Sequence, residues 1–471
     1  MKIKYIVLSL VVAFTFSCEN PDEFLDVLPK GRVIPSALKD YDDLLSNYAI
    51  LRGKGENLRY MDPDVFMSDV VYGNIQNDVV STNAYRWAHD LYPENGRDQD
   101  YIEFYDYIHQ SNFILENIGD AEVGNYQESM RPILRGEALA QRAFEYFHAV
   151  NEYAPHYDPN NPEELAIAMP LSVDLEAQLG KSSTGDIYNQ ILSDLERAME
   201  LIGPDYPAIN RTMNWRPGTA SILALLAEVH LYMGNFSEAV NYSNQALAKY
   251  NFLYDYNNVE FRNSSNPWLG YSVGGDINAW IYGTLNQETI WNRYTQYGFR
   301  TPHLYHPDFE ALYDKDNDRR WHLFSTQVTS AGLDTSPNYC YIYVGERSVG
   351  LTTYRLMLTN AEAKARTGDG SGAIAMLNQL LEMRITNFTP YTHTDNASTL
   401  QLIKNERRKE LHGSSLNIFD QKRYHIYGDN VPTYTRVIPD SGDTVTLEPG
   451  DEGYYLGIAP AILNLNPNLR D

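Results

Sequence analysis

Cysteine is almost absent from this 471-residue chain, which contains only Cys18 and Cys340. Two cysteines are too few for the disulfide framework that stabilises many small secreted proteins. Basic residues are also scarce, because 37 lysines and arginines stand against 62 aspartates and glutamates and leave a formal net charge of −25. Such an acidic chain repels phosphate backbones, so the sequence argues against nucleic acid as a partner.

Long apolar runs are missing as well. The apolar stretch at residues 5–16 is shorter than the roughly 20 residues that a transmembrane helix needs. Two lysines precede this stretch and the small Ser17 follows it, which is typical of a secretory signal peptide. We therefore expect residues 1–17 to be a signal peptide.

Cys18 directly follows the predicted cleavage site, where bacterial lipoproteins carry the cysteine that receives diacylglycerol. Thr15 stands where such proteins usually have leucine, so an ordinary signal peptide with a chance cysteine is the alternative. We expect Cys18 to be lipidated, since each buried acyl CH₂ contributes about 0.8 kcal/mol to membrane anchoring. Residues 18–35, acidic and interrupted by proline, would then form a tether.

Three blocks of the chain have the apolar spacing of amphipathic helices. They cover residues 101–118, 133–154 and 183–202. The third begins at Ser183, whose hydroxyl suits an N-cap, and the second carries small residues such as Ala138 that allow close helix contact. A mostly helical fold is predicted.

Two later segments, AEVHLYMGNFSEAVNYSNQAL and AEAKARTGDGSGAIAMLNQLL, resemble each other. Gly234 and Gly368 lie where a helix hairpin must turn, and Ala239 and Ala373 lie where the returning helix crosses its partner. Small residues at the crossing and glycine at the turn are the physical basis of tetratricopeptide-like hairpins. Such hairpins normally follow one another directly, so the long segment between these two predicts an insertion.

The insertion covers residues 251–345 and is rich in Gly, Asn and aromatic residues, a composition of loops and short strands. We expect a single domain over residues 36–471. Its helical scaffold would cover about 36–250 and 346–425, and an irregular C-terminal segment would follow at 426–471.

Several segments, in this order, resemble the SusD/RagB family of outer-membrane nutrient-binding lipoproteins of the Bacteroidota. CENPDEFLDVLPKG is similar to the family's lipidated start, both hairpins match, and APAILNLNPNLRD is similar to its end, although Ala459 and Ala461 flank Pro460 where the family usually has an Ile-Pro pair. Two further helices carry matching residues: Gly136, Glu137, Ala138, Arg142, Ala143, Tyr146 and Phe147 in one, and Glu406, Arg407, Arg408, Glu410, Phe419, Asp420 and Arg423 in the other.

The resemblance implies a mostly α, SusD-like fold, in which tetratricopeptide-like hairpins support an irregular, loop-rich ligand-binding face. It also implies a lipid-anchored protein on the outer membrane, facing the cell surface. Family members cover a SusC-type TonB-dependent transporter as a lid, capture oligosaccharides or, in some members, peptides, and carry out no reaction on them. No cofactor is implied.

Catalytic and metal-binding alternatives find little support in the residues. Glu406 and Glu410 share a helix face, but three basic residues lie between them, which favours structural ion pairing over the carboxylate pair of a glycosidase. The stretch DKDNDRR begins like a calcium loop but has Arg319 where that loop requires glycine. His303 and His306 lack a third ligand at a suitable spacing, so we expect surface histidines and no metal.

A sugar-binding site needs an aromatic ring against the apolar face of a pyranose and polar groups for its hydroxyls. Aromatic residues outside the periodic helices, with polar neighbours, are the best candidates, whereas Trp291 in a strand-like stretch is expected in the core. The candidate ligand-binding residues are Asp69, Asn74, Trp87, Trp268, Trp280, Tyr282, Arg293 and Tyr294.

Three functions remain open from the residues alone. The first is a surface glycan-binding lipoprotein that works with a transporter, with peptides as an alternative ligand. The second is a tetratricopeptide-type adaptor that holds a protein in its helical groove, although such an adaptor would not need the aromatic insertion. The third is a glycoside hydrolase, which would release reducing ends from a polysaccharide.

Overall fold

The computed structural model describes residues 35–52, 55–174, 176–276, 286–295, 303–342 and 347–470. The predicted signal peptide, Cys18 and nearly all of the tether lie outside the described residues, as do Trp280 and Tyr282 of the insertion. The fold is mostly α-helical with several small sheets, as the sequence predicted. Among the described helices, none combines the length and the apolarity that a bilayer span requires.

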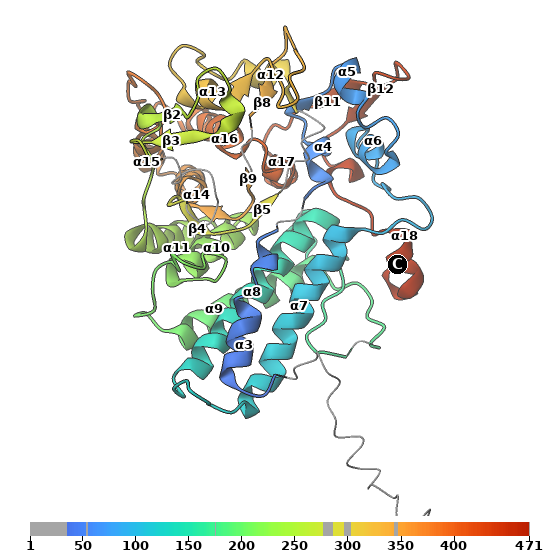
Figure 1. The fold of residues 1–471 in the computed structure, drawn as a ribbon, viewed down its shortest axis with the longest axis vertical. Coiled ribbons are helices and arrows are strands. Elements are labelled where there is room, and N and C mark those ends of the chain that lie inside the picture. The colour runs from blue at the N-terminus through green and yellow to red at the C-terminus, as the bar shows by residue number, and fades with distance from the viewer. Residues whose placement is uncertain are drawn as a thin grey trace, which may run out of the picture.

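Long helices form the lower part of the molecule in Figure 1, where α8 packs between α7 and α9. The predicted blocks fall on these helices, and the Ser183 hydroxyl accepts a hydrogen bond from the Asp186 N–H, as expected of an N-cap. Ala138 is fully buried, which allows the close packing of α8. The helices of this part are α3 (Leu38–Leu45), α7 (Gln99–Asn117), α8 (Met130–Tyr153) and α9 (Thr184–Ile202), with the 3₁₀ turn η2 (Ile118–Asp120).

Both predicted hairpins are present. Gly234 and Gly368 make the turns with φ of +78° and +89°, a backbone region that favours glycine. Ala239 and Ala373 are fully buried at the crossings. Helix α11 of the first hairpin packs on α14 of the second, so the two are neighbours in space although the insertion separates them in sequence. The hairpins comprise α10 (Thr219–Tyr232) with α11 (Phe236–Lys249), and α14 (Thr353–Arg366) with α15 (Gly370–Glu382).

The insertion folds as short elements, most of them at the top of Figure 1, whereas β4 and β5 lie lower in the picture. Its strands join a sheet of order β1-β6-β8-β7 and two-stranded ladders that pair β2 with β3, β4 with β10 and β5 with β9. Trp291 is fully buried in β4, as predicted. The elements of the insertion are η3 (Tyr256–Asn258), β2 (Val259–Phe261), η4 (Pro267–Leu269), β3 (Tyr271–Val273), β4 (Thr289–Trp291), β5 (Tyr294–Thr295), β6 (Leu304–Tyr305), α12 (Pro307–Glu310), α13 (Arg319–Phe324), β7 (Ser325–Thr326) and β8 (Cys340–Tyr341). The partner strands β9 (Arg347–Ser348) and β10 (Leu351–Thr352) directly follow it.

A short N-terminal segment packs with the insertion and also reaches α7, where the Asp100 carboxylate accepts hydrogen bonds from the Gly55 and Glu56 N–H groups. Val65 in β1 pairs with Tyr305 in β6, so the first part of the predicted scaffold contributes an edge strand to the insertion's sheet. Arg436, from the C-terminal segment, donates hydrogen bonds to the backbone carbonyls of Tyr60, Val65 and Tyr85 in this N-terminal segment. The elements involved are η1 (Tyr48–Leu51), α4 (Leu58–Met61), β1 (Val65–Phe66), α5 (Asp69–Tyr72) and α6 (Val79–Tyr85).

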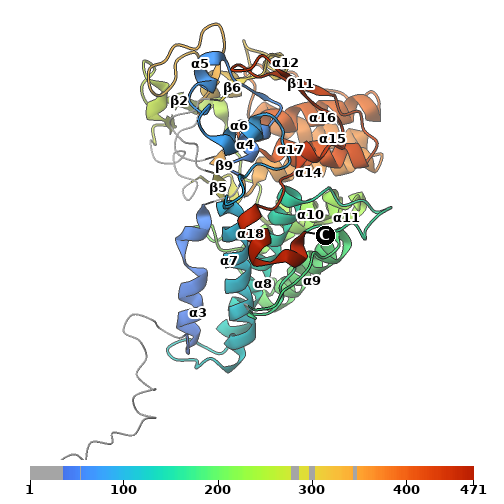
Figure 2. The same cartoon turned by 90° about the vertical axis from the view of Figure 1, so that its right-hand side faces the viewer.

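Helices α16 and α17 and the C-terminal segment that follows them complete the fold. Helices α16 and α17 lie beside the second hairpin in Figure 2, and the tail runs back along α7 and ends near it. The hairpin β11–β12 lies near α5 and α6. The elements are α16 (Asn396–Leu411), α17 (Leu416–Ile426), β11 (Tyr434–Val437), β12 (Thr444–Leu447), η5 (Glu452–Tyr454), α18 (Pro460–Leu465) and η6 (Pro467–Leu469).

Buried ion pairs connect the hairpins to α16 and α17. Glu228 on α10 accepts hydrogen bonds from Arg355 on α14 at 3.1 Å and from Arg407 on α16 at 2.9 Å. Arg407 also donates to Asp420 on α17 at 2.6 Å, and Asp420 accepts from Arg423 at 2.9 Å. All of these side chains are buried, so the charged residues of the sequence motif around Glu406 belong largely to the core.

Asp62 provides a test of the packing between the N- and C-terminal segments. It is buried beside Asp64 and accepts hydrogen bonds from the Asp64 N–H at 3.0 Å and the Asn417 amide at 3.1 Å. Burial and the Asp64 charge raise the pKa of Asp62 from 3.8 to about 7. The folded chain therefore binds a proton here more tightly than the unfolded chain does, so this group costs stability as the pH rises from about 4 to about 7.

We expect the variant Asp62→Asn, which keeps an oxygen acceptor without the charge, to gain stability relative to the parent across this pH interval. Urea unfolding of both proteins at several pH values between about 4 and 7 measures the difference. Parallel stability curves for parent and variant would show that Asp62 does not titrate in this interval.

Candidate functional site

Two of the sequence candidates, Trp87 and Arg293, are core residues. The Trp87 indole N–H donates to the Met61 carbonyl at 2.6 Å, and the guanidinium of Arg436 lies 4.1 Å from the centroid of its ring. Arg293 is 2% exposed and donates to Gln141 at 2.7 Å. Neither side chain is open to a ligand in this structure, which differs from the expectation that both line a surface site.

Four other candidates lie nearer the surface. Asp69 and Asn74 are exposed at the start of α5 and just after it. Trp268 is half-buried, with its indole N–H donating to the Val328 carbonyl at 2.9 Å, and Tyr294 is half-buried in β5. None of the six described candidates lines either of the two cavities described next.

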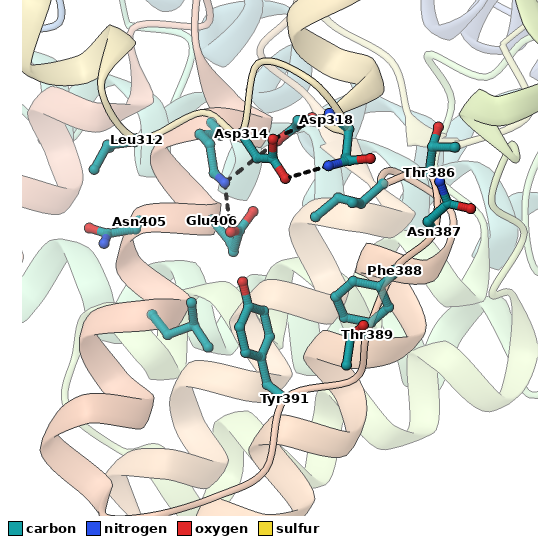
Figure 3. A pocket seen from close by; sticks show the side chains of 14 residues that line it. Leu312, Asp314, Asp318, Thr386, Asn387, Phe388, Thr389, Tyr391, Asn405 and Glu406 are labelled. Atoms are coloured by element: carbon teal, nitrogen blue, oxygen red, sulfur yellow. Dashed lines mark hydrogen bonds and ion pairs between the residues drawn. The ribbon is translucent and has the colours of Figure 1, made fainter.

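A polar cavity of about 450 Å³ lies between three segments, and we call it the α15–α16 pocket. Residues 385–391 of the loop after α15, one face of α16 and the turn at 312–318 line it. Figure 3 shows Tyr391 on one side of the cavity and the carboxylates of Asp314 and Glu406 on the other. Its size falls in the range of about 300–1,000 Å³ that is usual for small-molecule sites.

The aromatic wall of this pocket is held in place by its own loop. The Asn378 amide donates to the Tyr391 carbonyl and accepts from the Tyr391 N–H, both at 2.9 Å. The rings of Phe388 and Tyr391 meet edge to face with centroids 5.8 Å apart. Tyr391 nevertheless remains 43% exposed, so this loop presents an aromatic ring to the cavity.

The floor of the pocket is a buried ion-pair cluster. Arg320 donates to Asp318 and Glu406 at 2.7 Å and to Glu410 at 3.0 Å. The Lys409 ammonium lies 2.7 Å from Glu406 and 3.6 Å from Asp318. Burial alone would raise the pKa of Asp318, but the charges of Arg320 and Lys409 bring it below its usual value. The structural ion pairing predicted for Glu406 and Glu410 is confirmed.

The turn that resembled a calcium loop directs its oxygens at protein donors. Asp314 accepts hydrogen bonds from the Asp316 N–H at 3.1 Å and the Asn317 amide at 2.9 Å. Asp318 caps α13 by accepting from the Arg320 N–H at 3.0 Å. Among the described residues, no group of three or more His, Cys, Asp or Glu side chains has an arrangement that could hold a metal ion.

The two histidines considered as a metal pair have separate roles. His303 is buried, with its ring centroid 5.8 Å from that of Tyr60, so the expectation of a surface histidine was wrong there. His306 caps α12 by accepting a hydrogen bond from the Asp308 N–H at 3.3 Å.

A second cavity of about 300 Å³ lies between α7, the loop around residues 168–179 and the C-terminal tail. The stacked rings of Tyr101 and Tyr105, with centroids 4.5 Å apart, contribute to one wall. Leu179 and Leu465 line the opposite part and are partly or largely exposed. The surface of this cavity is more apolar than that of the α15–α16 pocket, which combines an aromatic ring with several amides and carboxylates.

The sequence candidates include none of the residues of the α15–α16 pocket. Tyr391 nevertheless met the criterion used for the insertion, because NFTPYTHTD places aromatic rings outside the periodic helices among polar neighbours. The pocket joins a short connection between two helices, residues 385–391, to a turn of the insertion, residues 312–318, which comes about 70 positions earlier in the chain.

Two family models match the chain. Residues 23–231 match a SusD-like model described as starch-binding and associating with the outer membrane. Residues 351–469 match the model of the SusD family, SusD/RagB. No curated protein matches the chain in sequence.

Solved structures share the fold at low sequence identity. A SusD-like carbohydrate binding protein from Bacteroides vulgatus is 20% identical, with a TM-score of 0.64 over 92% of this chain and 98% of its own. A SusD superfamily protein from Bacteroides thetaiotaomicron is 18% identical, with a TM-score of 0.69 over 92% and 99% of the two chains. One from Parabacteroides distasonis is 16% identical, with a TM-score of 0.62 over 92% and 98%. Together with the two matching family models, this shared fold places the chain in the SusD/RagB family.

Proposed function

We propose that this chain is a cell-surface glycan-binding lipoprotein that captures oligosaccharides and delivers them to a SusC-type TonB-dependent transporter. Its membership of the SusD/RagB family carries the proposal, since the model that matches residues 23–231 is described as starch-binding and associating with the outer membrane. A structural neighbour described as a carbohydrate binding protein supports the same ligand class.

Binding rather than hydrolysis fits the carboxylates of the described residues. A glycosidase needs one carboxylic acid and one carboxylate that face the scissile bond across a cleft. Glu406 and Glu410 instead share Arg320 in the floor of the α15–α16 pocket and are 3% and 4% exposed. Such pairing suits a rigid binding surface, and capture for transport requires no bond to break.

The proposal also includes a lipid anchor at Cys18 and a transporter partner. Lipid at Cys18 would hold the chain on the outer membrane, and the acidic residues 18–35 would give it reach above the surface. A lid over a transporter must release what it captures, so we expect reversible binding of modest affinity. Trp268, Trp280 and Tyr282 of the insertion remain proposed ligand contacts.

The proposal predicts selective glycan binding by the soluble chain that begins after Cys18. Affinity gel electrophoresis against a panel of polysaccharides, followed by calorimetry with oligosaccharides, measures it. We expect one glycan class to bind and the others not to bind. A site that hydrogen-bonds sugar hydroxyls leaves polar groups unpaired when the wrong sugar enters, and each unpaired group costs about 1–3 kcal/mol of binding free energy.

The variants Trp268→Ala and Trp280→Ala report on the insertion, and Tyr48→Ala, at a tyrosine that is 74% exposed on η1, is the matched control. Full affinity in both tryptophan variants would remove these two tryptophans of the insertion from the ligand site. If no glycan of the panel binds and peptides do bind, the ligand class would be peptides rather than glycans.

A further inference from the structure

We propose that the α15–α16 pocket is a binding site for an uncharged pyranosyl residue and that it discriminates against uronate or sulfated sugars. The inference rests on the proposed function, because it assumes that the chain binds glycans. It adds a site at which one turn of the insertion meets α16 and the loop after α15, and a chemical class for the sugar that enters it.

Tyr391 supplies the surface on which a pyranose ring would lie. The two hydrogen bonds to Asn378 fix its backbone before any ligand arrives, which limits the entropy that binding would cost. The ring forms part of the cavity wall (Figure 3) and stays 43% exposed. The apolar C–H face of a neutral pyranose matches such a ring.

The rim of the pocket carries both donors and acceptors for sugar hydroxyls. The Asn405 side chain is half-buried on α16, and its oxygen accepts from Gln401 at 2.9 Å, so its N–H₂ group is the part that can donate. Asp314, on the turn at 312–318, is exposed and offers carboxylate oxygens as acceptors. A hydroxyl can donate to one of these groups and accept from the other, which an apolar ligand cannot do.

Charge decides which sugars fit. Asp314, Asp318 and Glu406 line the cavity with three carboxylates; Asp314 is exposed, whereas Asp318 and Glu406 are buried and paired with Arg320 and with the ammonium of Lys409. That ammonium is already 2.7 Å from Glu406 and 3.6 Å from Asp318. The hydrogen bond from the Asn317 amide keeps the pKa of Asp314 below its usual value, so this carboxylate is charged at neutral pH.

An acidic sugar would therefore meet the exposed Asp314 carboxylate while the cations of the floor are already paired, and such a juxtaposition of like charges costs binding free energy. The net charge of −25 adds a repulsive field around the whole molecule. A neutral pyranose meets neither penalty.

The experiment compares each neutral polysaccharide that binds the soluble chain with the same polymer oxidised at C6 to the uronate. We expect the oxidised form to bind at least about tenfold more weakly, a difference of about 1.4 kcal/mol. Raising the salt concentration should narrow this gap, because salt screens repulsion between charges.

Two variants and one control locate the effect. Tyr391→Ala should weaken binding of the neutral glycan about tenfold, whereas the control Tyr48→Ala should leave it unchanged. Asp314→Asn, which removes one charge from the rim, should reduce the preference for the neutral over the oxidised polymer several-fold. Thermal unfolding of each variant checks that it folds as the parent does.

The outcomes separate this inference from the proposed function. Glycan binding that is unaffected by Tyr391→Ala would overturn the pocket assignment and leave the proposed function in place. Equal or tighter binding of the oxidised polymer would overturn the charge preference. Failure of every glycan to bind the parent chain would overturn the proposed function and this inference with it.

Discussion

Replacing Glu228 by glutamine is expected to lower the free energy of unfolding by about 3–5 kcal/mol, because it removes the shared partner of two buried guanidinium groups. Glu228 is 1% exposed. It accepts hydrogen bonds from Arg355, Arg407 and Thr359 at 2.9–3.1 Å. An amide keeps the shape of the side chain but removes the carboxylate that Arg355 contacts and leaves Arg407 to Asp420 alone.

The same carboxylate makes stability depend on acid. Burial would raise the pKa of Glu228, but Arg355 and Arg407 lower it from 4.5 to about 2. The folded pKa lies below the unfolded one, so this contribution is complete above about pH 4.5 and is lost as the pH falls toward 2. The Glu228→Gln variant should lack this part of the acid sensitivity.

Glu200→Gln is the matched control, because Glu200 pairs with Arg197 on the exposed side of α9, where both side chains are more than half exposed. Exposed pairs contribute about 0–1 kcal/mol, so the control should unfold nearly as the parent does. Urea unfolding at pH 7 measures all three proteins. A Glu228→Gln protein as stable as the control would show that this cluster does not connect the hairpins to α16 energetically.

Arg320→Gln is expected to have an effect of similar size, about 3–5 kcal/mol, at the floor of the α15–α16 pocket. The guanidinium is 2% exposed and is the common partner of Asp318, Glu406 and Glu410. Without it, three buried carboxylates face one another with only neighbouring cations to balance them. Burial would raise the pKa of Asp318 and the charge of Arg320 lowers it, so without Arg320 this carboxyl should bind a proton more readily and the deficit should shrink as the pH is lowered toward 5.

The adjacent Arg319 offers a control within the same motif. Its guanidinium donates to the carbonyls of Tyr256 and Val259 at 3.2 and 2.8 Å, and no carboxylate depends on it in these contacts. Arg319→Gln should therefore cost less, about 1–3 kcal/mol, the usual worth of hydrogen bonds to a charged group. If Arg320→Gln and Arg319→Gln lose the same free energy of unfolding with the same pH dependence, the three carboxylates that share Arg320 would not account for the loss.

The hairpins were predictable because their determinants are local. A glycine at a turn with positive φ and an alanine at a helix crossing lie five residues apart in sequence, as Gly234 and Ala239 do. The stacking of the two hairpins was implied only by the resemblance between them, since α11 and α14 are separated by about 100 residues.

Burial by distant partners was not predictable. Trp87 sits in a polar, loop-like stretch, yet Arg436, nearly 350 residues later, covers its ring at 4.1 Å. Arg293 resembled a hydrogen-bonding residue of a surface site, yet Gln141 and Glu145 of α8 bind it in the core. In both cases the contact that removes the side chain from solvent depends on tertiary packing that no short pattern encodes.

The α15–α16 pocket also depends on tertiary packing, which here brings distant side chains together at a cavity instead of burying them. Tyr391 and Asn405 are close in sequence, but the pocket also needs the turn around Asp314. The ion pairs of Arg320 join this turn to α16, and backbone hydrogen bonds join it to residues 384–386. The sequence indicated aromatic and polar side chains in the loop. Only the fold shows that they face a common cavity.

A crystal structure of the soluble chain with its tightest-binding oligosaccharide tests the central proposal most directly. The glycan-binding role and the pocket assignment together predict a pyranose ring stacked on Tyr391, with its hydroxyls within hydrogen-bond reach of Asp314 and Asn405. Sugar density confined to other surfaces would contradict the pocket assignment. A chain that captures no glycan under saturating conditions would contradict the proposed function itself.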